Sequence, residues 1–242
     1  THTQHSKEST SVSKLTRHLA DGLLLVLPQQ ARTYLDALRL RRFPHVLVDY
    51  LSDGETAPSV ATTNFRGAYD ATAYLLQLGH RRIGLITGDL ETGCARQRLE
   101  GYKAALTDHQ VNVDPDLIYK GLFFQPQGYQ GAHHLLGLPE RPTAIFACND
   151  QMAFGVMEAA RERGLSLPDE LSVVGFDDIP QASHVHPRLT TVRQPLEQMG
   201  HRAALLLLHY IKHPDAKIER IELATELVIR DSCQTPRTNL TT

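Results

Sequence analysis

The chain has 242 residues, of which 41% are hydrophobic and 21% charged, which is typical of a folded globular protein. Its formal net charge is −2, from 25 basic and 27 acidic residues, which argues against nucleic-acid binding by this chain alone. The longest apolar stretches, such as Leu23 to Leu27, are far shorter than the ~20 residues of a membrane helix, so no membrane partner is expected.

Short apolar runs alternate along the chain with longer amphipathic stretches. The apolar runs predict buried strands at 22–27, 45–49, 82–88, 143–148 and 171–176. The amphipathic stretches predict helices at 30–41, 65–78, 95–106, 128–136, 151–163 and 196–211. Strands that alternate with helices form parallel sheets, so the sequence predicts an α/β, doubly wound fold. Further strands are predicted at 188–195 and 218–230, and a single sheet of this width is unusual enough to favour two lobes.

Polar side chains follow several of the predicted strands at the point where each strand ends. In doubly wound sheets, ligands bind outside the carboxyl ends of the strands, so these side chains are candidates for a binding site. Each of them taken alone is more often a helix cap or an ordinary strand-end carboxylate, and Asp150 is predicted to cap the helix 151–163. Together they would converge on one crevice, and they are Asp49, Asp89, Glu91, Thr92, Arg96, Arg98, Asn149, Asp150, Asp177 and Asp178.

Several kinds of chemistry are disfavoured at these strand ends. Neither GxGxxG nor GxxxxGK[ST] follows a strand, and Asp89 and Glu91 stand where a phosphate would bind. No GxSxG elbow is present, so hydrolysis by a serine nucleophile is not indicated. The 13 histidines include no HExxH motif, and the adjacent His133 and His134 would point about 100° apart on a helix. We therefore expect no metal and no cofactor.

Once these kinds of chemistry are set aside, the remaining function for these side chains is recognition of a neutral polar ligand. Carboxylates and amides exchange hydrogen bonds with hydroxyl groups, and an arginine fork can bridge two of them. Phe123 and Phe124 could supply an aromatic wall, although core packing is the alternative for each ring. This set of side chains suits a sugar or a nucleoside. The three cysteines lack CxxC spacing, which favours a reducing, cytoplasmic compartment over a disulfide framework.

Four motifs, in this order and spacing, closely resemble the lactose-repressor/galactose-repressor (LacI/GalR) family. They are QLGHRRIGLITG, ARQRLEGYKAAL, PTAIFACNDQMAFGVMEAARERGLSLPDELSVVGFDDI and PRLTTVRQPLEQMG, and the match runs from about Leu19 to Cys233. The resemblance implies a fold like that of type I periplasmic sugar-binding proteins, with two α/β lobes, three crossovers and a ligand cleft between the lobes. It also implies a bacterial transcription regulator, a repressor and not an enzyme, that forms a dimer or tetramer.

The resemblance assigns effector contacts to individual residues. Arg98 matches the arginine that contacts effector, and Asp177 matches the aspartate that binds ligand hydroxyls or ring nitrogens. Phe123 matches the aromatic platform, and Asn149 matches a polar ligand contact. Asp178, by contrast, is expected to be a neighbour that caps or braces the turn before Pro180.

Further contacts and the hinges come from the same resemblance. Gln194 and Leu196 match cleft-lining positions at a crossover, and Asp49 matches a first-lobe position that contacts sugar in some members. Effector would bridge the lobes and bias a hinge closure, which would change how attached domains bind operator DNA. The expected hinge residues are Thr62, Thr63, Asn64, Arg193 and Pro195, with a third crossover near His213–Lys217.

The predicted lobes follow from these crossovers. The first lobe would comprise 1–62 plus 196–213, and the second 63–195 plus 214–242. No segment resembles the helix-turn-helix of about 60 residues with which such a regulator would bind DNA. The resemblance also implies that the first strand and helix of the first lobe are missing from these 242 residues, so its sheet is expected to expose an edge.

The nature of the ligand can be narrowed further. Purine-responsive members of the family carry an arginine where this chain has Thr92, and so a sugar is favoured over a purine or nucleoside. The alternative function is a periplasmic protein that delivers sugar to a transporter, which would share the fold. Upstream sequence would distinguish the two, because a regulator carries a helix-turn-helix and a periplasmic protein carries a signal peptide.

Overall fold

The computed structural model describes residues 10–16, 19–28, 32–50 and 57–237. The chain divides into two compact units, each of which is described by itself. Unit 1 comprises Thr1–Thr62, Glu91–Cys94 and Pro195–Ala224; unit 2 comprises Thr63–Leu90, Ala95–Gln194 and Thr225–Thr242. Within the described ranges, no helix combines the length and the apolar character needed to cross a membrane.

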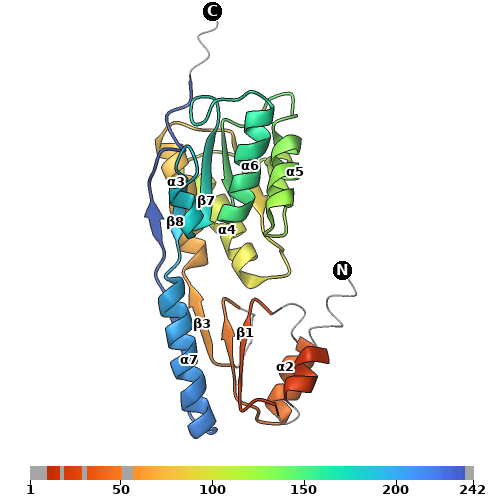
Figure 1. Cartoon of the computed structure of the whole chain (residues 1–242). Helices are drawn as coiled ribbons and strands as arrows, with labels where there is room; N and C mark the ends of the chain where they lie inside the picture. The colour runs from red at the N-terminus through yellow and green to blue at the C-terminus, as the bar shows by residue number, and fades with distance from the viewer. Residues whose placement is uncertain (1–9, 17–18, 29–31, 51–56, 238–242) are drawn as a thin grey trace, which may run out of the picture. The chain divides into compact units, whose positions relative to one another are not determined.

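Unit 1 is a four-stranded parallel sheet with helices on both faces, and its elements are β1 (Leu23–Val26), α2 (Arg32–Leu40), β2 (His45–Val48), β3 (Ser59–Thr62), α7 (Leu196–Lys212) and β9 (Arg220–Leu223). The strands lie in the order β1-β2-β3-β9. Alternate residues of a strand point to opposite faces, so Leu47 packs in the cluster with α2, while Val46 and Val48 pack with α7. In Figure 1, α2 and α7 accordingly lie on opposite sides of this sheet.

Unit 2 contains a larger sheet of six strands with its helices. Its elements are α3 (Asn64–Gln77), β4 (Ile83–Thr87), α4 (Gly93–Asp108), η1 (Pro115–Leu117), β5 (Ile118–Lys120), α5 (Gln125–Leu135), β6 (Ala144–Ala147), α6 (Asp150–Glu162), β7 (Ser172–Asp177), η2 (Pro180–Ser183), β8 (Thr190–Arg193) and β10 (Glu226–Val228). The first two residues of α4 are assigned to unit 1, and the rest of this helix, from Ala95, to unit 2. The strand order is β10-β8-β7-β6-β4-β5. Every pair is parallel except β10 with β8.

Helices of unit 2 pack closely, both on the sheet and on one another. Helices α5 and α6 lie side by side (Figure 1) and approach at two glycines. A Cβ at Gly128 would lie 2.1 Å from the Met152 carbonyl oxygen, and one at Gly155 would lie 2.3 Å from that of Gln125. Side chains cannot occupy such a space, so glycine sets the distance between the two helices. Strands β4 and β6 are buried along their length, and Ile145 and Phe146 of β6 are fully enclosed.

The predicted α/β, doubly wound architecture is confirmed, but two short strands were not predicted. They are β3, which follows Pro58, and β5, which has three residues and is not fully buried. Strand β5 is shorter than the runs of about four to eight residues on which strand prediction depends, and the sequence of β3, SVAT, places polar residues at both ends of a two-residue apolar run.

The predicted boundary between the lobes is wrong near the C-terminus. Residues 214–242 were assigned together to the second lobe, with a crossover near His213–Lys217. Instead β9 pairs in parallel with β3, which places the residues up to Ala224 in unit 1, and the chain passes into unit 2 at Thr225. Strand β10 then pairs antiparallel with β8. Alternation alone cannot tell which sheet a strand joins, because pairing depends on tertiary contacts.

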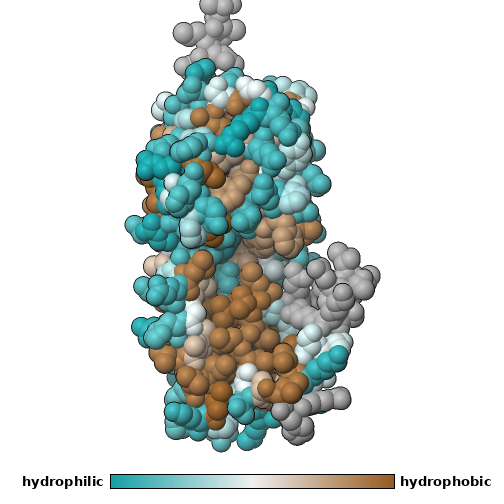
Figure 2. All heavy atoms as spheres, viewed as in Figure 1, coloured by the Kyte–Doolittle hydropathy of each residue, from teal (hydrophilic) through white to brown (hydrophobic). Residues whose placement is uncertain are grey.

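Strand β1 of the unit 1 sheet carries exposed apolar side chains. Strand β1 is the last strand of this sheet in the described part of the chain. The side chain of Val26 is 65% exposed, and Leu24 on the same face is exposed as well. On α7, Leu205 and Leu208 are also exposed. Figure 2 shows a broad apolar surface on unit 1.

Candidate functional site

Arg98 is a buried cation on α4, in unit 2. Its Nε donates to Oδ1 of Asn64 at 2.9 Å, and its Nη1 donates to the Cys148 carbonyl oxygen at 2.5 Å. The guanidinium carbon lies 3.7 Å from the centre of the Phe176 ring, close enough for a cation–π contact. Burial of a charge is costly unless it is paired, and the counter-charge is Asp177, whose Oδ1 lies 3.7 Å from Nη1. The arginine is thus held in one orientation from several sides.

Asp177 is the last residue of β7, and its side chain is 22% exposed. Gln194 binds it twice, by its Nε2 to Oδ1 at 2.7 Å and by its backbone amide to the Asp177 carbonyl oxygen at 3.2 Å. The backbone φ of Asp177 is +114°, a conformation that costs a residue with a side chain on the order of 1–3 kcal/mol. Such strain is typical of functional sites, where the surrounding structure holds it in place.

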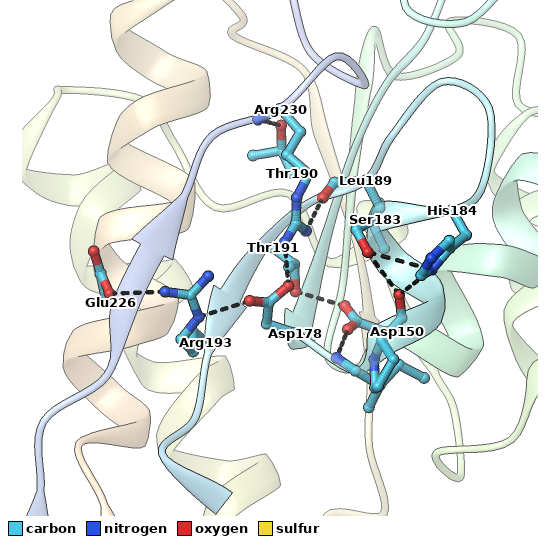
Figure 3. A network of polar contacts seen from close by, with 12 residues as sticks. Asp150, Asp178, Ser183, His184, Leu189, Thr190, Thr191, Arg193, Glu226 and Arg230 are labelled. Atoms are coloured by element: carbon cyan, nitrogen blue, oxygen red, sulfur yellow. Dashed lines mark hydrogen bonds and ion pairs between the residues drawn. The ribbon is translucent and has the colours of Figure 1, made fainter.

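Asp178 has a different environment from its neighbour. Its side chain is 8% exposed and accepts from Nε of Arg193 at 2.7 Å and from Nη2 of Arg230 at 2.6 Å (Figure 3). It therefore ties the end of β8 to the segment that follows β10. Asp178 was expected to cap or brace the turn before Pro180. Its two carboxylate oxygens bind arginines, and the Ile179 amide of that turn donates to Asp150.

The predicted cap of α6 is also wrong, by one residue. Asn149 is the N-cap, since its Oδ1 accepts the Met152 amide at 2.9 Å, and its Nδ2 donates to the Phe123 carbonyl oxygen at 2.9 Å. Asp150 is instead the first helical residue, and its carboxylate accepts the Ile179 amide at 2.9 Å. Asn149, a predicted ligand contact, thus has a structural role as well.

Phe123 stands at the carboxyl end of β4. Its φ is +69°, and its ring lies over Gly88, where a Cβ would be 1.9 Å from the Phe123 Cζ. The ring centre is 5.8 Å from the guanidinium carbon of Arg98. Only a glycine at 88 leaves room for this ring, so the platform depends on two positions that are far apart in sequence. The neighbouring Phe124 is exposed.

The predicted contacts of unit 1 lie at the ends of its elements. Asp49 directly follows β2, is buried, has a φ of +52° and donates its amide to the Val60 carbonyl oxygen at 2.9 Å. Leu196 is the first residue of α7 and is exposed. Unit 2 by itself brings together the other predicted contacts, namely Arg98, Phe123, Asn149, Asp177 and Gln194.

The chain passes between the units at two of the predicted hinges, after Thr62 and after Gln194. Asn64, predicted only as a hinge residue, is also a partner of Arg98. Sequence reasoning missed this role, and the only local signal was an amide at the start of a predicted helix. Pro195 is the N-cap of α7, and Arg193 pairs with Asp178.

Two further observations concern the chemistry of the site. Burial is the main cause that raises the pKa of Asp150 to about 7, and the nearby charges of Asp177 and Asp178 act in the same direction. Across the described residues, no group of three or more His, Cys, Asp or Glu side chains could hold a metal ion. The arrangement is therefore one of buried hydrogen-bonding groups around an arginine–aspartate pair.

Comparison with known proteins defines the class. The family of periplasmic binding protein-like domains matches residues 72–233. The complex of the transcriptional regulator CelR with cellobiose has a TM-score of 0.88 and 30% identity, over 96% of this chain and 71% of that chain. A LacI family regulator from Enterococcus faecium with bound ribose has a TM-score of 0.83 and 31% identity, over 93% of this chain and 84% of that chain. The chain is thus a type I periplasmic-binding-protein-like, effector-binding domain.

Similarity to curated proteins identifies one family of regulators within this class of protein. The HTH-type transcriptional repressor PurR of Haemophilus influenzae (strain PittEE) is 34% identical over 230 residues, which cover 93% of this chain and 68% of the repressor. The chain belongs to the LacI family of transcriptional regulators. These relatives are named as regulators of transcription.

Proposed function

We propose that this chain is the effector-sensing, dimerising part of a bacterial repressor and that its effector is a sugar. The observation that carries the proposal is the pairing of Arg98 with Asp177 at the carboxyl ends of β6 and β7. A carboxylate accepts hydrogen bonds from two neighbouring hydroxyls, and a guanidinium donates to ring or hydroxyl oxygens. The aromatic ring of Phe123, beside Arg98, would cover the apolar C–H face of a sugar ring.

A sugar is favoured over a purine for two reasons. The loop after β4 carries Asp89, Glu91 and Thr92 but no arginine before the helix, so it lacks the residue with which purine-responsive relatives hold their ligand. In addition, two similar structures hold cellobiose and ribose. The similarity to repressors named PurR makes a purine the second candidate.

Effector binding is proposed to involve further contacts and to alter the affinity for operator DNA. Asn149 and Gln194 of unit 2, and Asp49 and Leu196 of unit 1, are the further proposed contacts. Effector binding would change the backbone at the hinge residues and so the operator affinity of a helix-turn-helix domain that lies outside these 242 residues. The working unit would be a homodimer or tetramer, as symmetric operator half-sites require.

A thermal-shift screen followed by calorimetry tests the proposal. Cellobiose, D-ribose and adenine would be compared first, because a specific ligand raises the melting temperature by mass action. For a sugar that binds, we expect Arg98→Ala and Asp177→Ala each to weaken binding by about 10- to 100-fold, the cost of a hydrogen bond to a charged group.

Arg188→Ala is the matched control, since Arg188 also pairs with an aspartate, Asp231 at 2.6 Å, but on an exposed surface of unit 2. Its affinity is expected to equal that of the wild type. If Arg98→Ala and Asp177→Ala bind the sugar as tightly as this control, the proposed site is wrong. If only adenine raises the melting temperature, the sugar assignment is wrong.

A further inference from the structure

Asp150 is a carboxylate that is 0% exposed and joins three elements of unit 2. It is the first residue of α6, its Oδ1 accepts from the hydroxyl of Thr191 on β8 at 2.5 Å, and its Oδ2 accepts from the amide of Ile179 at 2.9 Å. Figure 3 shows it beside Thr191, close to Asp178. Ile179 is only two residues beyond Asp177, so this contact acts directly on the turn that follows β7.

The space for the carboxylate is made by Gly175 on β7. A Cβ at that position would lie 2.3 Å from Oδ1 of Asp150. The two donors to Asp150 are neutral, and the charges that raise its pKa are the carboxylates of Asp177 and Asp178, which repel its charged form. A buried acid with two neutral donors and two acidic neighbours contributes little stability by itself, because its charged form is costly to bury without a cation.

The backbone beside Asp150 is the strained part of the site. Asp177 has a φ of +114° and Asp178 a φ of +57°, so two consecutive non-glycine residues have positive φ. Such a conformation persists only where surrounding contacts hold it. Gln194 holds the Asp177 side, the arginines hold Asp178, and Asp150 holds the amide on the far side of the turn.

We propose that Asp150 is a positioning residue, which keeps Asp177 turned toward Arg98 and Gln194 by holding the Ile179 amide and the Thr191 hydroxyl. It touches no ligand itself. The inference rests on the proposed function only in so far as Asp177 contacts the effector.

The variants separate hydrogen bonding from charge and from general stability. Asp150→Ala removes both contacts. Asp150→Asn keeps both, because the amide oxygen accepts from Ile179 and the amide nitrogen donates to the Thr191 oxygen. Thr191→Val removes one contact with little change in volume.

Ser232→Ala is the control for lost stability. Ser232 is equally buried, accepts the Thr190 amide at 2.8 Å and donates to the Val173 carbonyl oxygen at 2.6 Å. It therefore ties β8 to β7 through two hydrogen bonds, as Asp150 ties β8 to the turn, but it makes no contact with the turn. A loss of structure alone would affect Ser232→Ala and Asp150→Ala alike.

The first measurement needs no ligand. Amide exchange and the ¹H–¹⁵N signals of Ile179 and of the Arg98 Nε–H report the turn and the arginine. In Asp150→Ala, protection of the Ile179 amide is expected to fall by about tenfold or more, and the Arg98 signal to shift. In Asp150→Asn and Ser232→Ala both signals stay close to those of the wild type. Unchanged Ile179 and Arg98 signals in Asp150→Ala overturn the inference, whichever ligand binds.

The second measurement is calorimetry with D-ribose and cellobiose. Binding is expected to weaken about 10-fold or more in Asp150→Ala, several-fold in Thr191→Val, and less than about threefold in Asp150→Asn and Ser232→Ala. Equal losses of sugar affinity in Asp150→Ala and Ser232→Ala would show that Asp150 has only a structural role, which contradicts the inference. If neither sugar binds the wild type, the exchange measurement by itself decides the role of Asp150.

Discussion

Thr63 and Thr225 lie 162 positions apart in sequence, yet their hydroxyl oxygens are 2.9 Å apart. The Thr225 amide also donates to the Thr63 hydroxyl, at 2.9 Å. Each of these residues is the first of unit 2 after the chain leaves unit 1. Two of the passages between the units are therefore joined by hydrogen bonds at their unit 2 ends.

We expect Thr63→Val and Thr225→Val to be coupled. Neutral hydrogen bonds of this kind contribute about 0.5–1.5 kcal/mol each, and residues that share one show a similar coupling energy. Urea unfolding of the two single variants and the double variant measures it. Thr107→Val, which removes an exposed hydroxyl bound only within its own helix, is the control. Additive losses for Thr63 and Thr225 would show that the contact contributes nothing.

Arg98→Lys is expected to be far from conservative. A lysine has no planar fork with which to bind Asn64 and the Cys148 carbonyl together, and it loses the stacked contact with Phe176. Stability is expected to fall by about 1–3 kcal/mol, since buried acceptors lose their donor. Thermal and urea unfolding measure this, with the exposed Arg188→Lys as the comparison. Equal stability of the two variants would contradict the assigned contacts.

The raised pKa of Asp150 predicts how the stability of Asp150→Asn depends on pH. Burial raises this pKa from 3.8 to about 7, so between these values the folded protein holds a proton that the unfolded chain has released. The wild type therefore loses stability as pH rises from about 4 to 7, and nothing further from this group above 7. At 1.36 kcal/mol per pKa unit, the loss is on the order of 4 kcal/mol.

Asparagine cannot lose a proton in this way. The free energy of unfolding of Asp150→Asn should thus increase relative to the wild type between pH 4 and pH 7, and the difference should then stay constant. Urea unfolding of both proteins at several pH values measures it, and the other titrating groups cancel in the comparison. A difference that is the same at pH 4 and pH 8 would contradict the burial of an ionisable group at this position.

Gly88→Ala is expected to displace the aromatic platform. The added Cβ would lie 1.9 Å from the Phe123 Cζ, so the ring has to move away from the end of β4. Calorimetry should show weaker binding of any sugar that binds the wild type, by about tenfold.

Gly200→Ala is the matched control for this prediction. It lies within α7, and a Cβ there would meet nothing within 4 Å. Because alanine favours a helix, it is expected to stabilise the protein by about 0.5–1 kcal/mol. If both alanine variants bind the sugar equally, Phe123 is not part of the site.

The candidate site could be predicted in part because its residues stand at strand ends. Asp177 and Arg98 were recognisable from their motifs, and the parallel sheet brings such positions to one edge. The separate role of each residue in the adjacent pairs Asn149–Asp150 and Asp177–Asp178 could not be predicted. The cap of α6 was expected at Asp150 but is Asn149, because an N-cap has extended backbone and accepts an amide of the first turn, and Asp150 is already helical.

The alternation of helices with most of the strands, the apolar interior of the predicted strands and the family were determined by the sequence itself. Apolar periodicity and the glycine and proline positions are local properties of the chain, and burial follows from them directly. Only the tertiary structure decided which sheet β9 joins, why Asp178 faces two arginines, and how Asp150 reaches Ile179. These depend on contacts between residues that are far apart in sequence, such as Asp178 with Arg230, and no local pattern encodes the partner. Asp177 and Asp178 are adjacent carboxylates in the sequence, but the fold gives them separate arginine partners and therefore separate roles.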